Sequence, residues 1–225
     1  MKQSVFLIFV FLSASAQNQL FNNPDLGKTH FIVGLPPQEN NVQEEVRIVP
    51  GTDLHARLIC KDGSCMHAFF SPDDDLEELL IQLINAEQMA IQLAVFSFTD
   101  GAIAQALINA RRRGVKIVVI TDISGARDKF SKIDLLKKNG ITVLVYDPRN
   151  QTVLNNIMHH KFVLFEKNVG GKSLVWTGSY NFTKSATRNN QENIVLLDSK
   201  PLIDKYAKQF SLLQERTRKL PVKYA

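Results

Sequence analysis

A histidine and a lysine lie two positions apart at the start of an apolar run in the second half of the chain. His159 and Lys161 lead directly into the residues 162–165, which are all apolar. Because side chains alternate between the two faces of a strand, these two polar groups should point the same way. An imidazole beside a fixed cation suits phosphate chemistry, since the lysine attracts the anion and the imidazole attacks phosphorus or moves a proton.

A second polar pair closes the next apolar run along the chain. Ser179 and Asn181 are also two positions apart, and the glycine-containing segment 168–171 supplies turn residues between the two runs. Adjacent strands can therefore bring four polar groups to one end of a sheet. Spacing alone leaves an alternative open, because a single histidine on an apolar strand is more often a core or surface residue.

These residues resemble the signature of the phospholipase D superfamily, which is His-x-Lys, four residues, Asp, and later Gly-Ser-x-Asn. The chain reads His159-His160-Lys161 and Gly178-Ser179-Tyr180-Asn181, with Glu166 in place of the aspartate. We expect Glu166 to be tolerated, because that position looks structural in the family. The segment between Glu166 and Gly178 is also longer than usual, but its turn should lie away from the site.

The resemblance extends over about Phe69 to Leu213. The stretch from Ala94 to Asp122 is similar to small members with a single motif. These are the bacterial Nuc-type endonucleases and the mitochondrial cardiolipin hydrolase/Zucchini group. The resemblance implies a phospholipase D/nuclease-like fold and a phosphodiester hydrolase.

The resemblance also implies roles for individual residues. His159 would attack phosphorus to give a phosphohistidine, while the histidine of a second motif protonates the leaving alcohol. The chain holds one motif, so the second histidine should come from a homodimer with the active site on its two-fold axis. Lys161 and Asn181 would hold the phosphate oxygens with help from the hydroxyl of Ser179, and Glu192 would orient the imidazole.

These roles imply neither a cofactor nor a catalytic metal, because lysine and amide groups supply the charge stabilisation. His160 points to the opposite face and is given no chemical role. A catalytically inactive binding module is a third class of function, and the intact motif argues against it.

Substrate identity is less constrained than the reaction. An exported endonuclease cleaving DNA or RNA is the main prediction, because the chain resembles Nuc-type proteins and carries a net charge of +5. The alternative is a phospholipase D acting on phosphatidylcholine or cardiolipin in a membrane. No apolar loop near the motif is evident from the sequence to favour that alternative.

Alternating helical and strand patterns predict an α/β fold, with a mostly parallel mixed sheet flanked by helices on both faces. Helix starts are marked by Ser71-Pro72 with the acidic residues 73–75 and by Asp100, and helix ends by Gly114 and Asn139-Gly140. Strands are predicted at residues 66–70, 91–98, 115–121, 141–146 and 194–197, beside the two motif strands, and a last helix at about 201–218.

The amino-terminal residues indicate processing. Residues 1–16 combine Lys2, a short apolar stretch and a small-residue end, which predicts a cleaved signal peptide. Residues 17–45 form an irregular lead-in, and 46–225 a single catalytic domain. A secreted or periplasmic enzyme is predicted, and retention of the first segment as a membrane anchor is the alternative.

The two cysteines precede the first predicted strand. Cys60 and Cys65 bracket a short turn, and in an exported protein this spacing favours a disulfide. His55 and His67 lie nearby, so a structural zinc site made by these two histidines and the two cysteines is the alternative.

Overall fold

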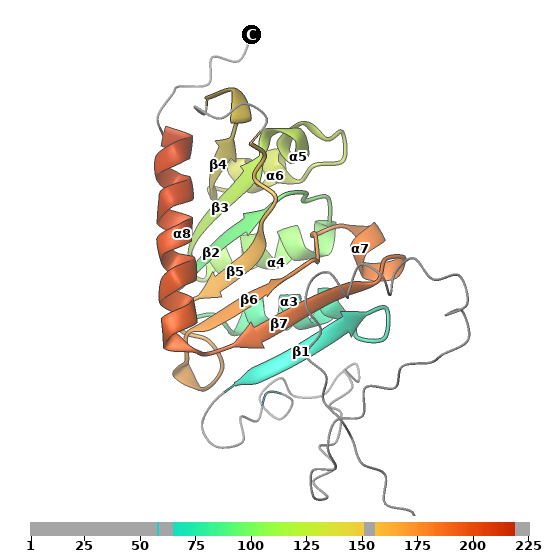
Figure 1. Cartoon of the computed structure of the whole chain (residues 1–225), viewed down its shortest axis with the longest axis vertical. Helices are drawn as coiled ribbons and strands as arrows, with labels where there is room; N and C mark the ends of the chain where they lie inside the picture. Colours follow the sequence, from blue (N-terminus) through green and yellow to red (C-terminus); the bar gives the residue numbers. More distant parts are fainter. Residues whose placement is uncertain (1–57, 59–64, 151–155, 219–225) are drawn as a thin grey trace, which may run out of the picture. The chain divides into compact units, whose positions relative to one another are not determined.

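The computed structural model describes residues 58, 65–150 and 156–218, all within the compact unit Glu45–Ala225 (Figure 1). The predicted signal peptide 1–16 and lead-in 17–45 lie outside the described residues. The strands are β1 Met66–Ser71, β2 Ala90–Val95, β3 Lys116–Asp122, β4 Thr142–Tyr146, β5 Lys161–Phe165, β6 Leu174–Gly178 and β7 Glu192–Leu197. The α-helices are α3 Leu76–Ala86, α4 Gly101–Arg112, α5 Ile123–Arg127, α6 Ile133–Lys138, α7 Lys184–Arg188 and α8 Lys200–Arg218. Within this part of the chain no helix is both long enough and apolar enough to span a bilayer.

The strands form one mixed sheet in the order β1-β7-β6-β5-β2-β3-β4 (Figure 1). The predicted mixed sheet flanked by helices is confirmed, but the expectation of mostly parallel pairing is wrong. Among the described strands, only β2–β3 and β3–β4 are parallel neighbours, and the other four pairings are antiparallel. Helices cross over between β2, β3 and β4, as parallel pairing requires, whereas β5 and β6 are joined by a short hairpin link that gives antiparallel pairing. The other antiparallel pairs are set by where β1, β5 and β7 lie in the strand order.

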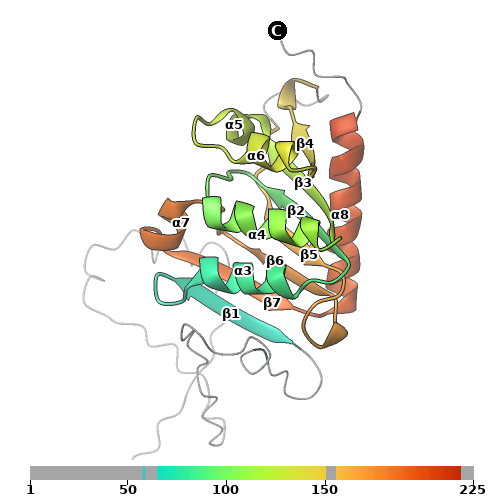
Figure 2. The ribbon, with the colours of Figure 1, turned by 180° about the vertical axis from the view of Figure 1, so that it is seen from behind.

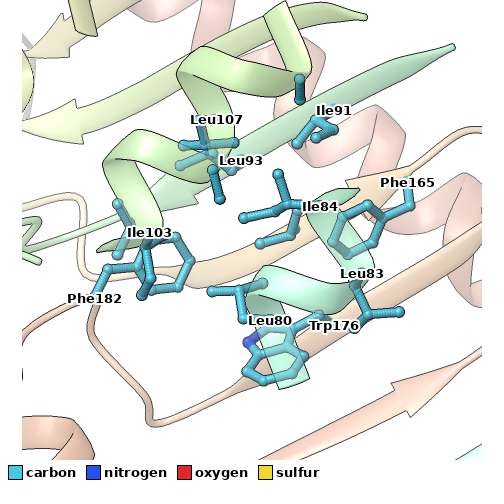
Figure 3. Close-up of a cluster of buried hydrophobic side chains, with 14 of the residues drawn as sticks. Leu80, Leu83, Ile84, Ile91, Leu93, Ile103, Leu107, Phe165, Trp176 and Phe182 are labelled. Carbon is cyan, nitrogen blue, oxygen red and sulfur yellow. The ribbon is translucent and has the colours of Figure 1, made fainter. Parts of the chain in front are cut away.

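Two helical layers cover the two faces of the sheet. Helices α3 and α4 lie on one face, as Figure 2 shows, and α8 runs across the other. The larger core lies under α3 and α4, where Leu80 and Leu83 lie beside Trp176 of β6 (Figure 3). Ile84 belongs to the same buried cluster. Asp75 caps α3 by accepting a hydrogen bond from the Glu78 amide, so the predicted helix start is confirmed.

The smaller core lies under α8. Phe210 is fully buried and packs edge-on against Phe162, at 6.3 Å between ring centroids. Tyr206 also packs on Phe162, and its hydroxyl donates to Thr177 Oγ1 over 3.0 Å. Helix α8 therefore packs against β5 and β6, the two strands that carry the motif.

The turn between β5 and β6 lies at the opposite end of these strands from His159. Gly170 and Gly171 have φ values of 65° and 73°, a conformation that glycine adopts without strain, and both are exposed. Asn168 is buried below the turn and donates to the Leu83 carbonyl over 2.9 Å. The longer turn noted in the sequence is thus ordered and distant from the motif.

Candidate active site

Three adjacent strands bring the predicted site residues to one end of the sheet. Lys161 is the first residue of β5, with His159 two residues before it, and Glu192 is the first residue of β7. Ser179 and Asn181 directly follow β6, which runs antiparallel to both neighbours. The starts of β5 and β7 and the end of β6 therefore meet, as the sequence spacing predicts.

The closest polar contact in this group joins Lys161 to His159. The lysine Nζ lies 3.2 Å from Nδ1 and 3.3 Å from Nε2 of the imidazole, and donates to the His159 carbonyl over 2.9 Å. The in-plane lone pairs of the two ring nitrogens diverge, so a cation equally close to both lies over the face of the ring. The lysine therefore does not occupy the edge of the imidazole.

Lys161 is a nearly buried cation, with 8% of its surface exposed. Burial lowers the pKa of its ammonium, and the nearby charge of Glu192 opposes that shift. Among the described residues, its hydrogen-bond contacts are with the carbonyl and the ring of His159, and none is with a carboxylate. Burial removes water from this ammonium, and a bound phosphate oxygen would supply a negative charge in its place.

Ser179 and Glu192 form a short hydrogen-bonded chain. The Ser179 hydroxyl donates to Oε2 of Glu192 and accepts from the Asn193 amide over 3.1 Å. The other carboxylate oxygen accepts from Asn190 Nδ2 over 2.9 Å. The one hydroxyl proton is therefore committed to Glu192, and Ser179 can donate to a phosphate only after that bond breaks.

Glu192 does not bond to the imidazole of His159 within the part of the chain that the structure describes. Its carboxylate is instead fixed by Ser179 and Asn190, and its amide by Ser71 Oγ over 3.2 Å. The expected orienting role of Glu192 stays a prediction, because a second subunit would bring a second imidazole to the site.

Asn181 is oriented by the backbone of Ser97, in the segment that follows strand β2. Its Oδ1 accepts from the Ser97 amide over 3.3 Å, while the Phe182 amide donates to the Ser97 carbonyl over 3.2 Å. With the oxygen engaged by backbone, the Nδ2 amide is the end left to donate to an anion.

Gly178 allows β6 to lie close to β7 beside the site. A Cβ atom at this position would lie 2.0 Å from the Asn193 carbonyl oxygen, which is closer than any side chain can approach. The same carbonyl accepts from the Ser179 amide over 3.0 Å. The glycine of the motif therefore has a steric role: it lets Ser179 reach Glu192.

His160 points away from the site, as predicted, toward α8. Its Nε2 lies 3.3 Å from Gln209 Nε2, and its ring packs against Phe162 at 5.8 Å between centroids. Burial lowers the pKa of His160, and the positive charges of Lys161, His159 and Arg216 lower it further. It stays neutral near pH 7.

Sequence reasoning missed three side chains that contact the site. Phe96 packs on the His159 imidazole at 4.6 Å between centroids, Ser71 Oγ accepts from the Glu192 amide, and Asp122 Oδ2 accepts from the Met158 amide. The sequence showed Ser71 and Asp122 only as boundaries of elements. Phe96 lies in an apolar stretch that carries no polar signal.

Glu166 lies at the other end of β5 from His159, where it is exposed. Among the described residues its carboxylate has no hydrogen-bond partner. The Glu166 amide donates to the Ala90 carbonyl, and the Glu166 carbonyl accepts from the Ser173 hydroxyl. Glu166 thus lies away from His159, and its expected tolerance in place of the family aspartate stays a prediction.

The cysteine region is described only in part. Cys65 is buried and disulfide-bonded, but Cys60 and His55 lie outside the described residues, so the predicted pairing stays a prediction. His67 stacks on Phe69 at 6.0 Å, and burial lowers its pKa. No cluster of three or more metal-ligating side chains occurs within residues 65–150 and 156–218.

Comparison with known proteins agrees with this geometry. Residues 80–213 match the family model "Cardiolipin synthase, PLD-like domain". A protein named phospholipase D from Rickettsia prowazekii is 32% identical over 137 residues, which cover 61% of this chain and 62% of that protein. A mitochondrial cardiolipin hydrolase from Xenopus laevis is 34% identical over 143 residues, covering 64% of this chain and 62% of that one. The chain thus spans a little over three-fifths of the length of these curated relatives.

Solved structures share the fold. NucT from Helicobacter pylori superposes with a TM-score of 0.61 at 26% identity, covering 68% of this chain and 97% of NucT. Nuc from Salmonella typhimurium, a phospholipase D family member, superposes with a TM-score of 0.59 at 24% identity, over 69% of this chain and 97% of Nuc. With a family match over more than half of its length, the chain belongs to the phospholipase D-like family.

Proposed function

We propose that this protein is a phosphodiester hydrolase that works through a phosphohistidine at His159. One observation carries the proposal: the nearly buried ammonium of Lys161 lies against the imidazole of His159, beside the free amide end of Asn181. A cation that has no carboxylate partner within the described part of the chain, next to a nucleophilic ring, is suited to binding an anion that the ring attacks.

The reaction would proceed in two displacements. A ring nitrogen of His159 attacks phosphorus, the bond to the leaving oxygen breaks, and that oxygen takes a proton from a second imidazolium. Water then gives a proton to the second imidazole and attacks phosphorus, and the P–N bond breaks to restore His159. Lys161 and Asn181 hold the non-bridging oxygens as charge develops, so we expect no metal requirement.

The second imidazole would be the partner subunit's His159. The sequence holds one His-x-Lys motif, and among the described residues His159 is the one histidine on the site's face at this end of the sheet. A two-fold homodimer whose axis passes the site would place both imidazoles on one phosphate. In that dimer Glu192, which bonds to Ser179 within its own chain, would be placed to orient an imidazole.

Nucleic acid is the proposed substrate class. The support is the likeness to NucT and Nuc, together with the net charge of +5. The predicted signal peptide would make the protein an exported endonuclease. Cleavage would be insensitive to chelators and would depend on salt, because phosphate contacts release counterions.

A phospholipid substrate is the second candidate, and two exposed apolar side chains favour it. Ile157, two residues before His159, is 51% exposed, and Phe130 in the loop between α5 and α6 is 62% exposed. Lys129 lies over the Phe130 ring, 4.8 Å from its centroid, which combines a cation with an apolar group. The relatives named phospholipase D and cardiolipin hydrolase fit the same reading.

The test compares the two substrate classes on one preparation. The purified protein and a His159→Ala variant are incubated in excess EDTA with plasmid DNA, single-stranded RNA, and vesicles of phosphatidylcholine or cardiolipin. Nicking that the variant lacks supports the nuclease, and release of headgroup supports the phospholipase. Acid quenching followed by mass spectrometry should find a phosphoryl adduct on the peptide with His159. Absence of both turnover and adduct on every substrate would refute the proposal.

A further inference from the structure

The proposed nucleophile lies outside the strand that carries its motif. Strand β5 begins at Lys161, so His159 belongs to the segment that leads into it. Pairing between β2 and β5 ends at Val95 and Lys161, with one further bond from the Phe96 amide to the His160 carbonyl over 3.1 Å. The sheet alone therefore does not fix the position of His159.

A buried carboxylate supplies the first additional contact. Asp122, the last residue of β3, is 1% exposed, and its Oδ2 accepts from the Met158 amide over 3.0 Å. Its Oδ1 accepts from the amide and the hydroxyl of Ser124, over 2.9 and 2.5 Å, and so caps α5. A buried carboxylate is costly unless it is hydrogen-bonded, and these bonds tie the residue before His159 to the end of β3.

An aromatic ring supplies the second contact. Phe96 packs on the imidazole of His159 with an interplanar angle of 56°, and the Lys161 ammonium lies 5.4 Å from the centroid of the same ring. The Phe96 carbonyl accepts from Thr121 Oγ1 over 3.3 Å, and a Cβ at Gly125 would lie 1.9 Å from that carbonyl oxygen. Helix α5 therefore lies directly against the backbone of Phe96.

These two contacts belong to one structural unit. Asp122 caps α5, and α5 in turn packs on Phe96, so the backbone anchor and the ring contact are both fastened to the same turn of helix. We propose that Asp122 and Phe96 are positioning residues: Asp122 fixes the backbone before His159, and Phe96 fixes its ring, so that a ring nitrogen faces phosphorus. This inference rests on the proposed role of His159 as nucleophile.

Kinetics of folded variants provide the first test, with bis(4-nitrophenyl) phosphate as the substrate. Asp122→Ala should lower kcat about 100-fold, because an error of about 1 Å in the placement of a reacting group has that effect. Its KM should change by no more than about threefold, since the groups that bind phosphate are untouched. Asp122→Asn should recover part of kcat, because its amide oxygen can accept from the Met158 amide while its Nδ2 cannot replace Oδ1 as the acceptor for Ser124. Phe96→Leu should lower kcat about tenfold.

Asp147→Ala is the matched control. Asp147 is an equally placed carboxylate just beyond the end of β4, 4% exposed and hydrogen-bonded by Arg149, with no contact to the segment before His159 among the described residues. Its removal should lower stability and leave kcat unchanged. If folded Asp122→Ala and Phe96→Leu both keep the wild-type kcat, the inference is wrong.

A second readout does not depend on turnover. Hydrogen exchange at the Met158 amide should accelerate in Asp122→Ala, and the His159 ring signals in NMR spectra should broaden in both Asp122→Ala and Phe96→Leu. Unchanged exchange and unchanged ring signals would overturn the inference. If wild type cleaves no phosphodiester, the proposed function fails while these measurements still decide the positioning. If Asp122→Ala does not fold, Phe96→Leu carries both the kinetic test and the ring-signal test.

Discussion

A buried ionisable side chain lies at each end of strand β5, and the two differ in how many hydrogen bonds the protein gives them. At the far end Glu87, 2% exposed, accepts three backbone amides on Oε1 and Asn168 Nδ2 on Oε2. At the near end Lys161 is almost as buried, yet within residues 65–150 and 156–218 its side chain bonds only to the carbonyl and ring of His159. A buried charged side chain that makes all its hydrogen bonds within the protein stabilises the fold. A buried charged side chain that lacks an oppositely charged partner can instead bind a charged ligand.

Replacing Lys161 should have the largest effect on activity. Lys161→Met removes the cation that would neutralise the phosphate, so we expect turnover to fall about 1,000-fold. Stability should be equal or higher, because an apolar side chain of similar length avoids burying an ammonium. Parallel assays of phosphodiester cleavage and urea unfolding test both parts. A variant that unfolds more easily would show that the lysine is structural.

Replacing Glu87 should produce the reverse pattern. Glu87→Ala leaves the Met89, Ala90 and Lys167 amides without their shared acceptor, so we expect a loss of about 3 kcal/mol in the free energy of unfolding. Glu87→Gln should lose less, since its oxygen can take the place of Oε1. Activity per folded molecule should not change. If turnover falls in folded Glu87→Gln, Glu87 contributes to activity and the proposed difference between the two ends of β5 is wrong.

The pH dependence of stability should differ between wild type and Lys161→Met. Burial lowers the pKa of Lys161 below its ordinary value of 10.5, so the folded state binds this proton less tightly than the unfolded state does. Stability of wild type relative to the variant should therefore rise as pH increases from the folded pKa toward 10.5. Urea midpoints of both proteins across that range measure the difference. A flat difference would mean that the ammonium is not desolvated.

The smallest effect is expected at Glu166. Glu166→Asp restores the residue typical of the family at an exposed position far from His159, so we expect activity within about twofold and stability within about 0.5 kcal/mol of wild type. Plasmid nicking and thermal unfolding measure the two quantities. A large gain in turnover would mean that the far end of β5 is coupled to the site.

Patterns local in sequence carried most of what could be predicted. Apolar periodicity found the buried face of α3 and the strands, and the spacing of His159, Lys161, Ser179 and Asn181 indicated that they would meet. These features follow from side-chain geometry within one element or one hairpin.

What could not be predicted depends on residues far apart in the chain. Asp122 and Met158 are 36 positions apart, and Ser71 and Glu192 are 121 apart, so no local pattern joins them. The antiparallel pairing of β5 with β2 was missed for the same reason, because the order of strands in a sheet is decided by packing of the whole domain.

The glycine turn between β5 and β6 is a suitable place to attach a label to the protein. Gly170 and Gly171 are exposed, and Asn168 beside them is buried. The whole length of β5 separates this turn from His159. Exposed loop tips tolerate insertions, since added residues extend into solvent and break few contacts. An affinity tag or fluorophore placed between the two glycines would let the protein be immobilised or tracked during catalysis with its reactive end facing outward.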